Sequence, residues 1–161
     1  MSRKIRVWHP GSIFHITSRG NRHATLFYDD YDRKKYLTLL NETCEKFPFY
    51  LHAYCLMTNH IHLLLEIIND PPGEIIKMAH SLYAIYFNKR HELDGHVFQG
   101  RYKSELIDSP QYLLEASRYI HLNPVKAGIV EHPAQYPWSS YLSYVTTNSN
   151  PFIVTQRILS H

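Results

Sequence analysis

The chain of 161 residues predicts an α+β fold in which an antiparallel sheet carries two helices on one face. Short β-rich runs bounded by turn residues indicate strands, and two longer segments with apolar residues at helical spacing indicate helices. Their order is strand, helix, strand, strand, helix, strand, which is the order of the split βαβ, or ferredoxin-like, fold. A hydrophobic content of 44% is enough for one buried core.

Capping and turn residues mark the boundaries of the two helices. Asp29 and Asp30 are candidate N-caps for the first helix, and Pro48 ends it. Pro71-Pro72-Gly73 separates the third strand from the second helix. The expected elements are a strand at 13–17, a helix at about 30–46, a strand at 50–56 that forms a hairpin with a strand beginning at His60, a helix at 74–90 and a strand at 97–107.

An additional helix is expected after the last strand. Ser109 is a typical N-cap and Pro110 a typical first residue, and Pro124 is expected to stop the helix. One side of this helix is polar, which indicates that it faces something other than the core; its residues are Tyr112, Glu115, Tyr119 and Asn123.

The strand that begins at His60 carries a histidine pair. Side chains alternate along a strand, so His60 and His62 share one face, while the apolar residues at 61, 63, 65 and 67 share the other. The helices should cover the apolar face. In this topology the first and third strands are neighbours, so His15 and Thr17 could lie near the pair. The pair is either half of a metal site or an ordinary half-exposed strand face.

The charge of the chain is mildly basic, at +3 with a pI near 8.8, which permits a polyanionic partner without demanding one. The basic residues fall into local groups, each of which alone could be a solvated surface. These groups are Arg3/Lys4/Arg6, Arg19/Arg22/His23, Lys89/Arg90/His91, Arg101/Lys103 and Lys126.

Compartment signals favour a cytoplasmic protein with no membrane segment. No apolar run approaches the length of a membrane span, and the N-terminus lacks the apolar core of a secretory signal. Cys44 and Cys55 stand in apolar patterns without a C-x-x-C pair, so they are expected to be buried free thiols.

Five motifs follow one another along the chain: Phe14-His15-Ile16-Thr17-Ser18-Arg19-Gly20-Asn21-Arg22, His60-Ile61-His62, Phe98-Gln99-Gly100-Arg101-Tyr102-Lys103, Tyr119-Ile120-His121-Leu122-Asn123-Pro124-Val125-Lys126-Ala127-Gly128 and Trp138-Ser139-Ser140-Tyr141. In this order they resemble the motifs of the single-tyrosine HUH transposases, and among these of the REP-associated tyrosine transposases. The resemblance covers about residues 8–145, which predicts one domain at 1–145 and an unassigned C-terminal tail at 146–161.

The resemblance implies metal-dependent cleavage and rejoining of single-stranded, hairpin-associated DNA through a covalent 5′-phosphotyrosine at Tyr119. It also implies that His60, His62 and Asn123 hold Mg²⁺ or Mn²⁺, where Asn123 replaces a glutamine of related enzymes and His121 is a weaker competitor. Expected DNA contacts are Arg19, Asn21, Arg22, Arg101, Lys103 and Lys126.

Interpretations without a catalytic role stay open for several of these residues. Asn123-Pro124 can simply end a helix, Tyr102 fits a DNA-backbone contact better than a nucleophile, and Glu66 fits a solvated strand-end carboxylate better than a group that tunes a metal ligand. Two other functions remain: a replication-initiator-like nickase and a non-catalytic, domesticated DNA-binding protein. The sequence also leaves open a homodimer in which Tyr119 serves a partner's histidines.

Overall fold

The computed structural model describes residues 8–146, 150 and 152–161. The N-terminal basic group Arg3/Lys4/Arg6 lies outside the described residues, as do positions 147–149 and 151 of the predicted tail.

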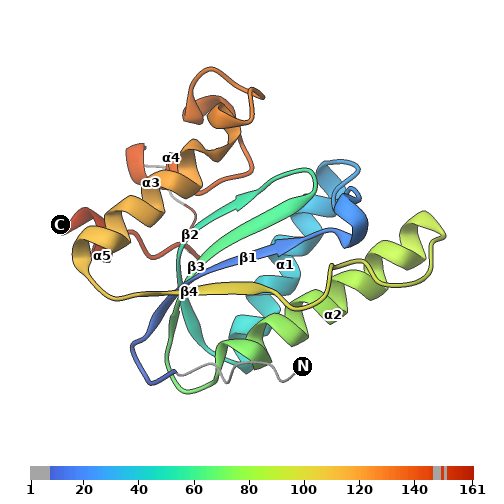
Figure 1. The fold of residues 1–161 in the computed structure, drawn as a ribbon, viewed down its shortest axis with the longest axis horizontal. Coiled ribbons are helices and arrows are strands. Elements are labelled where there is room, and N and C mark those ends of the chain that lie inside the picture. Colours follow the sequence, from blue (N-terminus) through green and yellow to red (C-terminus); the bar gives the residue numbers. More distant parts are fainter. Residues whose placement is uncertain (1–7, 147–149, 151) are drawn as a thin grey trace.

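Four antiparallel strands form the sheet at the centre of the molecule (Figure 1). They are β1 (Ile13–Arg19), β2 (Phe49–Leu56), β3 (His60–Ile67) and β4 (Lys103–Ile107), in the order β2-β3-β1-β4. The predicted hairpin is β2–β3, and β1 pairs with both β3 and β4. The ferredoxin-like strand order is therefore confirmed, including the central neighbours β1 and β3.

Two helices, α1 (Asp30–Lys46) and α2 (Pro72–His91), cover one face of the sheet, as predicted. Asp29 is the N-cap of α1, because its side chain accepts a hydrogen bond from the Asp32 N–H. The apolar stripe expected along α2 is Ile75, Ala79, Leu82 and Tyr86; the first two are buried, whereas Leu82 and Tyr86 are only half-buried. In the second half of the helix Tyr83 and Phe87 are buried instead, one residue further along.

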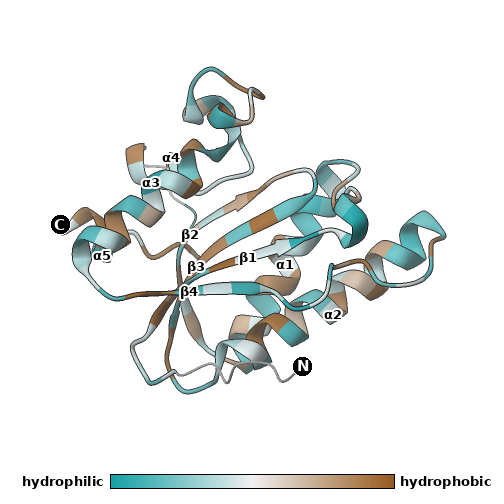
Figure 2. Ribbon diagram, viewed as in Figure 1, coloured by the Kyte–Doolittle hydropathy of each residue, from teal (hydrophilic) through white to brown (hydrophobic). Residues whose placement is uncertain are grey.

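The other face of the sheet is covered by α3 (Pro110–Lys126), which begins at its predicted N-cap Ser109. A second apolar core lies between this helix and the sheet, with Leu113 and Ile120 of α3 packed in the same cluster as Leu64 of β3. The histidine-bearing face is therefore not open along its whole length. Figure 2 shows the hydrophobic residues of β2 and β3 between the helical layers, with hydrophilic residues on the outer strand β4.

Two predicted boundaries are wrong. The last strand starts at Lys103 rather than at residue 97, because Gly100 has a left-handed backbone (φ 48°) that interrupts the extended run. Before it, Phe98 makes only an isolated bridge to Gly20. Helix α3 continues through Pro124 to Lys126, since a proline this close to the C-terminus removes only one hydrogen bond and the Ala127 N–H still bonds to the Asn123 carbonyl.

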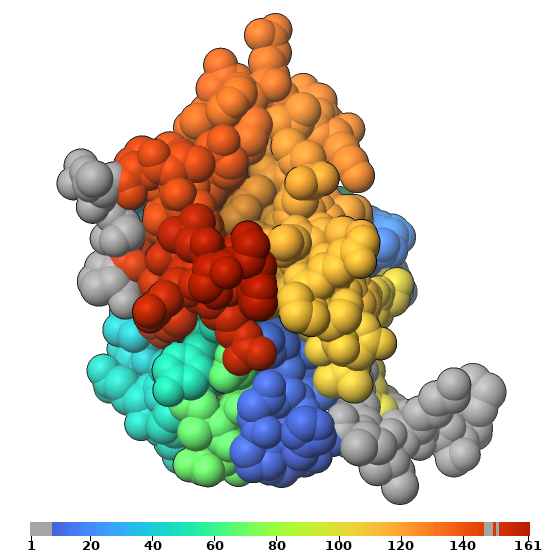
Figure 3. All heavy atoms as spheres, turned by 90° about the vertical axis from the view of Figure 1, so that its left-hand side faces the viewer, coloured from blue at the N-terminus to red at the C-terminus, as the bar shows by residue number. Residues whose placement is uncertain are grey.

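The C-terminal segments fold back onto the sheet and α3. They comprise the short 3-10 helix η2 (Pro133–Gln135), α4 (Tyr141–Val145) and α5 (Gln156–Leu159); a further 3-10 helix, η1 (Asn21–His23), follows β1. Val154 N–H bonds to the carbonyl of Leu51 on β2, and Ile158 is buried in the α3 core. Figure 3 shows the last residues lying against α3.

Glu66 has a role in this C-terminal docking. Its Oε1 atom lies 2.9 Å from His52 Nε2 and 3.0 Å from Arg157 Nη1. The prediction of a solvated strand-end carboxylate is therefore wrong, because the tail covers Glu66 and supplies a cation. Cys55 is buried and Cys44 half-buried, and both thiols are free. In the described part of the chain, no helix has the length and hydropathy needed to cross a membrane.

Candidate active site

The two histidines of β3 lie beside His15 and Thr17 of β1. Antiparallel register places Thr17 opposite His62 and Arg19 opposite His60. The Nδ1 atom of His62 is 3.0 Å from His15 Nε2 and 3.3 Å from Thr17 Oγ1. The predicted neighbour relation between the two strands is therefore confirmed, and it orients the His62 ring.

The opposite nitrogen of His62 is the distinctive atom of this site. Its Nε2 is buried and has no hydrogen-bond partner among the described residues. Burial, followed by the nearby His15, His60 and Arg19, lowers the pKa of His62 to about 3, so the ring is neutral at physiological pH. A neutral ring whose Nδ1 donates its hydrogen presents a lone pair at Nε2.

His60 faces an oxygen on each side. Its Nδ1 lies 2.8 Å from Asn59 Oδ1, and its Nε2 lies 3.1 Å from Asn123 Oδ1. Burial is the main cause that lowers the pKa of His60, opposed by the contact with Asn123. When the neutral ring donates from Nδ1 to Asn59, two acceptors face each other between His60 and Asn123. A cation between them would satisfy both.

Tyr119 of α3 completes the arrangement. Its ring centroid is 5.6 Å from that of His62 and 5.8 Å from that of His15, and its side chain is 43% exposed. Lys126 Nζ lies 5.1 Å from the centre of the Tyr119 ring. The tyrosine therefore meets the histidines of its own chain while remaining partly exposed in the lining of the cavity they share.

The position of α3 over the histidines is fixed partly by His121. This residue is buried, its Nε2 is 2.6 Å from Ser140 Oγ, and burial lowers its pKa to about 4. His121 thus points away from His60 and His62, as the helical spacing predicts, and links α3 to the C-terminal segment.

A cavity of about 1020 Å³ contains the histidines and Tyr119. Arg19, Arg101 and Lys103, three of the predicted DNA contacts, line it. Asn21 and Arg22 do not: Arg22 has a left-handed backbone (φ 56°) in η1 and is exposed outside the cavity. Lys126 does not line the cavity either, but its Nζ lies over the ring of Tyr119, which does.

Sequence reasoning did not assign several lining residues to the site. Tyr112 and Glu115 belong to the polar stripe of α3, and Glu105 is opposite His15 in the β1–β4 register, so strand and helix periodicity could have found them. Ala116 also lines the cavity from α3, and the others come from η1 or from loops, where neither strand nor long-helix periodicity applies; they are His23, Asn59 and Gln99.

The side chains of this site offer nitrogen and oxygen ligands to a divalent cation. No group of three or more His, Cys, Asp or Glu side chains is arranged to hold a metal within the described ranges. The set here is two imidazoles and one amide oxygen, and the buried, unpartnered Nε2 of His62 is its most direct sign. Such a set leaves positions for phosphate oxygens and water.

Comparisons with known proteins identify the family of this chain. The family described as "Transposase IS200 like" matches residues 10–123, which include every lining residue of the Tyr119 cavity and Asn123. A Haemophilus influenzae protein described as a candidate REP-associated tyrosine transposase is 27% identical over 152 residues, covering 88% of this chain and 86% of that protein.

Two solved structures share the fold. One is a REP-associated tyrosine transposase bound to a REP hairpin, with a TM-score of 0.78, 20% identity and coverage of 96% of this chain and 91% of that one. The other is a candidate transposase from Deinococcus radiodurans, with a TM-score of 0.50, 14% identity and coverage of 74% and 95%. Because the family match extends over most of the sequence, this chain belongs to the IS200-like transposases, a family of enzymes that act on DNA.

Proposed function

We propose that this protein cleaves and rejoins single-stranded DNA through a covalent bond between Tyr119 and a 5′ phosphate. The observation that supports this most strongly is the buried, unpartnered Nε2 of His62, next to the ring of an accessible tyrosine. An unpartnered buried nitrogen costs about 1–3 kcal/mol, so a ligand that completes it gives a reason for its presence.

The proposed reaction uses the Tyr119 hydroxyl as nucleophile. Its oxygen attacks the phosphorus of a DNA phosphodiester, the bond to the 3′ oxygen breaks, and the phenolic proton passes to solvent while the leaving 3′ oxygen takes one up. The products are a 5′-phosphotyrosine and a free 3′-OH. Because a phenolate leaves more easily than an alkoxide, a 3′-OH can attack the intermediate and rejoin a strand.

His60, His62 and Asn123 would hold Mg²⁺ or Mn²⁺ in this reaction. When bound, such an ion polarises the scissile phosphate and stabilises the charge that develops on it. The contribution of the chain is orientation. His15 and Thr17 hold His62 through Nδ1, and Asn59 holds His60 through Nδ1, so both Nε2 atoms are left for the ion.

The proposed substrate is a single strand next to a hairpin. Arg19, Arg101 and Lys103 line the cavity and can position phosphates. A strand without a partner gives Tyr119 the flexible phosphate that in-line attack needs, and a structural relative is bound to a REP hairpin. Since Tyr119 and His62 meet within one chain, the geometry supports a reaction completed by one protomer.

The test is the covalent adduct. Wild type is incubated with labelled single-stranded DNA from the flanks of its own gene, with Mg²⁺ or EDTA, and resolved on a denaturing gel. We expect an adduct that resists SDS and needs the metal. Tyr119→Phe should abolish it, whereas Tyr50→Phe, a control tyrosine of similar exposure (45%) outside the cavity, should retain it.

Two results would contradict the proposal. Normal adduct formation by Tyr119→Phe would remove the proposed nucleophile. A native-gel shift of the DNA by wild type, with no adduct under any metal condition, would instead favour the non-catalytic DNA-binding function.

A further inference from the structure

A second cavity, of about 440 Å³, lies between α2 and the segment at 95–102 that leads from α2 to β4. Figure 1 shows this segment running back along the helix. The cavity is on the face of the sheet that α1 and α2 cover, opposite the Tyr119 cavity. Its volume is within the range of roughly 300–1,000 Å³ that is typical of pockets for small ligands.

Ser18 is the first sign that this cavity binds something. It lines the cavity, its side chain is 5% exposed, and its Oγ has no hydrogen-bond partner among the residues that the structure describes. Phe14 and Ile16, which share the Ser18 face of β1, are buried in the core against α1 and α2, so Ser18 occupies an apolar position with a polar group. A hydroxyl can donate and accept, and would suit the polar edge of a planar ligand.

The interior of the cavity is aromatic and uncharged. His80 is 8% exposed, its Nε2 is 2.9 Å from the Tyr36 hydroxyl, and its ring stacks on Phe98 with centroids 4.1 Å apart and an interplanar angle of 10°. Burial lowers the pKa of His80 to about 3, so the ring carries no charge at neutral pH. These groups favour a neutral, flat ligand over an anion.

The rim of the cavity is basic. Lys77, His96 and Arg101 are exposed lining residues, and no described lining residue is an aspartate or glutamate. The Tyr119 cavity differs, because Glu105 and Glu115 line it. A neutral aromatic interior with a cationic rim is complementary to a nucleobase whose phosphate stays at the surface.

The two cavities share a wall. Gln99 and Arg101 line both, and the Gln99 N–H bonds to the carbonyl of Arg19 at 2.8 Å, which ties the shared wall to the end of β1. A DNA strand that crosses this wall would reach from one face of the sheet to the other. We propose that the second cavity binds one unpaired nucleobase of the strand whose phosphate lies at Tyr119, an inference that rests on the proposed function.

The test measures binding without cleavage. Fluorescence anisotropy measures the affinity of the protein for a labelled hairpin-flanking strand from its own gene, in EDTA. A series of such strands carries one abasic nucleotide, placed at each single-stranded position in turn. Ala84→Leu adds volume from α2, and Ser18→Ala removes the unpartnered hydroxyl, which should leave folding stability unchanged or higher. Ile85→Ala is the control, because the Ile85 side chain, next to Ala84 in the sequence, is 67% exposed and lies outside both cavities.

For wild type and Ile85→Ala, we expect one abasic position to weaken binding by about 5- to 150-fold, the range for loss of one stacked base. Ala84→Leu should weaken binding of the intact strand by a similar factor. In this variant, an abasic nucleotide at the same position should cause no further loss of affinity. Ser18→Ala should show a smaller change in the same direction.

An abasic profile of Ala84→Leu identical to that of wild type would overturn the inference. So would a loss of affinity in that variant that is equal for intact and abasic strands, because it would indicate a contact with phosphate only. Since binding is measured in EDTA, absence of a Tyr119 adduct would count against the proposed function and not against this cavity.

Discussion

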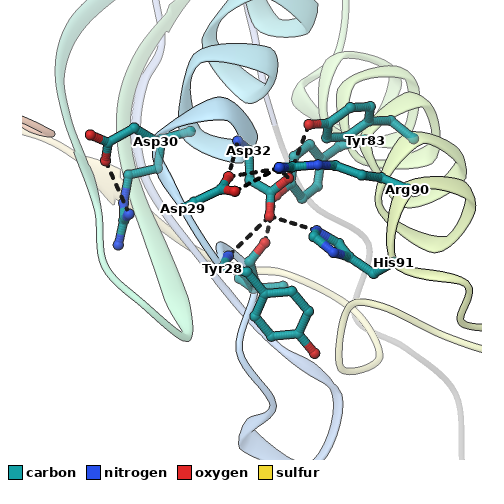
Figure 4. A network of polar contacts seen from close by, with 10 residues as sticks. Tyr28, Asp29, Asp30, Asp32, Tyr83, Arg90 and His91 are labelled. Atoms are coloured by element: carbon teal, nitrogen blue, oxygen red, sulfur yellow. Dashed lines mark hydrogen bonds and ion pairs between the residues drawn. The ribbon is translucent and has the colours of Figure 1, made fainter.

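The Asp32 carboxylate, between α1 and α2, and the His62 ring, between β1, β3 and α3, are both nearly inaccessible, with exposed fractions of 0% and 4%. Asp32 Oδ2 accepts from the Tyr28 N–H at 2.9 Å and lies 2.8 Å from His91 Nε2. Its Oδ1 accepts from Tyr86 at 3.0 Å and from Arg90 at 2.6 Å. Figure 4 shows Arg90 reaching from α2 to the start of α1.

The His62 ring, in contrast, has hydrogen-bond partners on one nitrogen only among the described residues. This difference in hydrogen bonding distinguishes a buried polar group that stabilises the fold from one that can bind a ligand. A carboxylate with all its hydrogen bonds satisfied joins two helices and has no capacity for a ligand. A neutral imidazole with a free nitrogen next to an accessible tyrosine contributes less to folding and leaves a position for a ligand.

His62→Ala should produce the largest change in activity. Removing the free Nε2 takes away a proposed metal ligand, so we expect the rate of DNA cleavage to fall by at least about 100-fold. Denaturing gels with saturating Mg²⁺ measure this. His161→Ala, which changes an exposed histidine at the C-terminal end, should cleave normally. Retained cleavage by His62→Ala would mean that the open nitrogen has no part in the reaction.

Asp32→Asn should act on stability instead. Burial raises the pKa of Asp32, but the four hydrogen bonds to its carboxylate outweigh this effect and lower the pKa. The ionised carboxylate therefore stabilises the folded state fully above the unfolded pKa near 3.9. This stabilisation is lost as the pH falls through the lower pKa of the folded state. At pH 7 we expect a loss of roughly 2–3 kcal/mol, since Arg90 remains partly solvated. Urea unfolding measures this, with the difference from wild type narrowing below about pH 4. A difference that is constant with pH would contradict the account.

Arg157→Ala tests an intermediate case and should have the smallest effect. Arg157 pairs with Glu66, but its side chain is 48% exposed, so we expect a loss of about 0.5 kcal/mol in urea unfolding. Cleavage should not change, because the pair lies outside the Tyr119 cavity. A loss of cleavage at unchanged stability would connect the docked tail to the active site.

The strand order and the association of His60, His62, Tyr119 and Asn123 could be predicted because they depend on periodicity. Alternation along β3 and helical spacing along α3 each direct a polar side to one face. The start of β4 could not be predicted in the same way, since a single left-handed Gly100 decides it. Nor could the pairing of Glu66, because Arg157 is 91 residues away along the chain.

The residues predicted to contact DNA show the same limit. Arg19, Arg101 and Lys103 lie on strands or next to them, and the predicted strand order brings them to one cavity. Arg22 stands only three residues after Arg19, but the left-handed turn of η1 directs it elsewhere. Which ring nitrogen of His62 meets His15 and Thr17, and which stays without a partner among the described residues, depends on side-chain geometry that no sequence pattern specifies.

The most direct measurement is the identity of the residue that carries the DNA. Trypsin cleaves after Arg118 and after Lys126, so Tyr119 is the only tyrosine in the peptide 119–126, while Tyr112 falls in 104–118. The adduct is isolated, its DNA trimmed by nuclease and its tryptic peptides analysed by mass spectrometry. The account predicts a nucleotide on peptide 119–126 in Mg²⁺ and none in EDTA. A nucleotide on any other tyrosine peptide, with 119–126 unmodified, would contradict it.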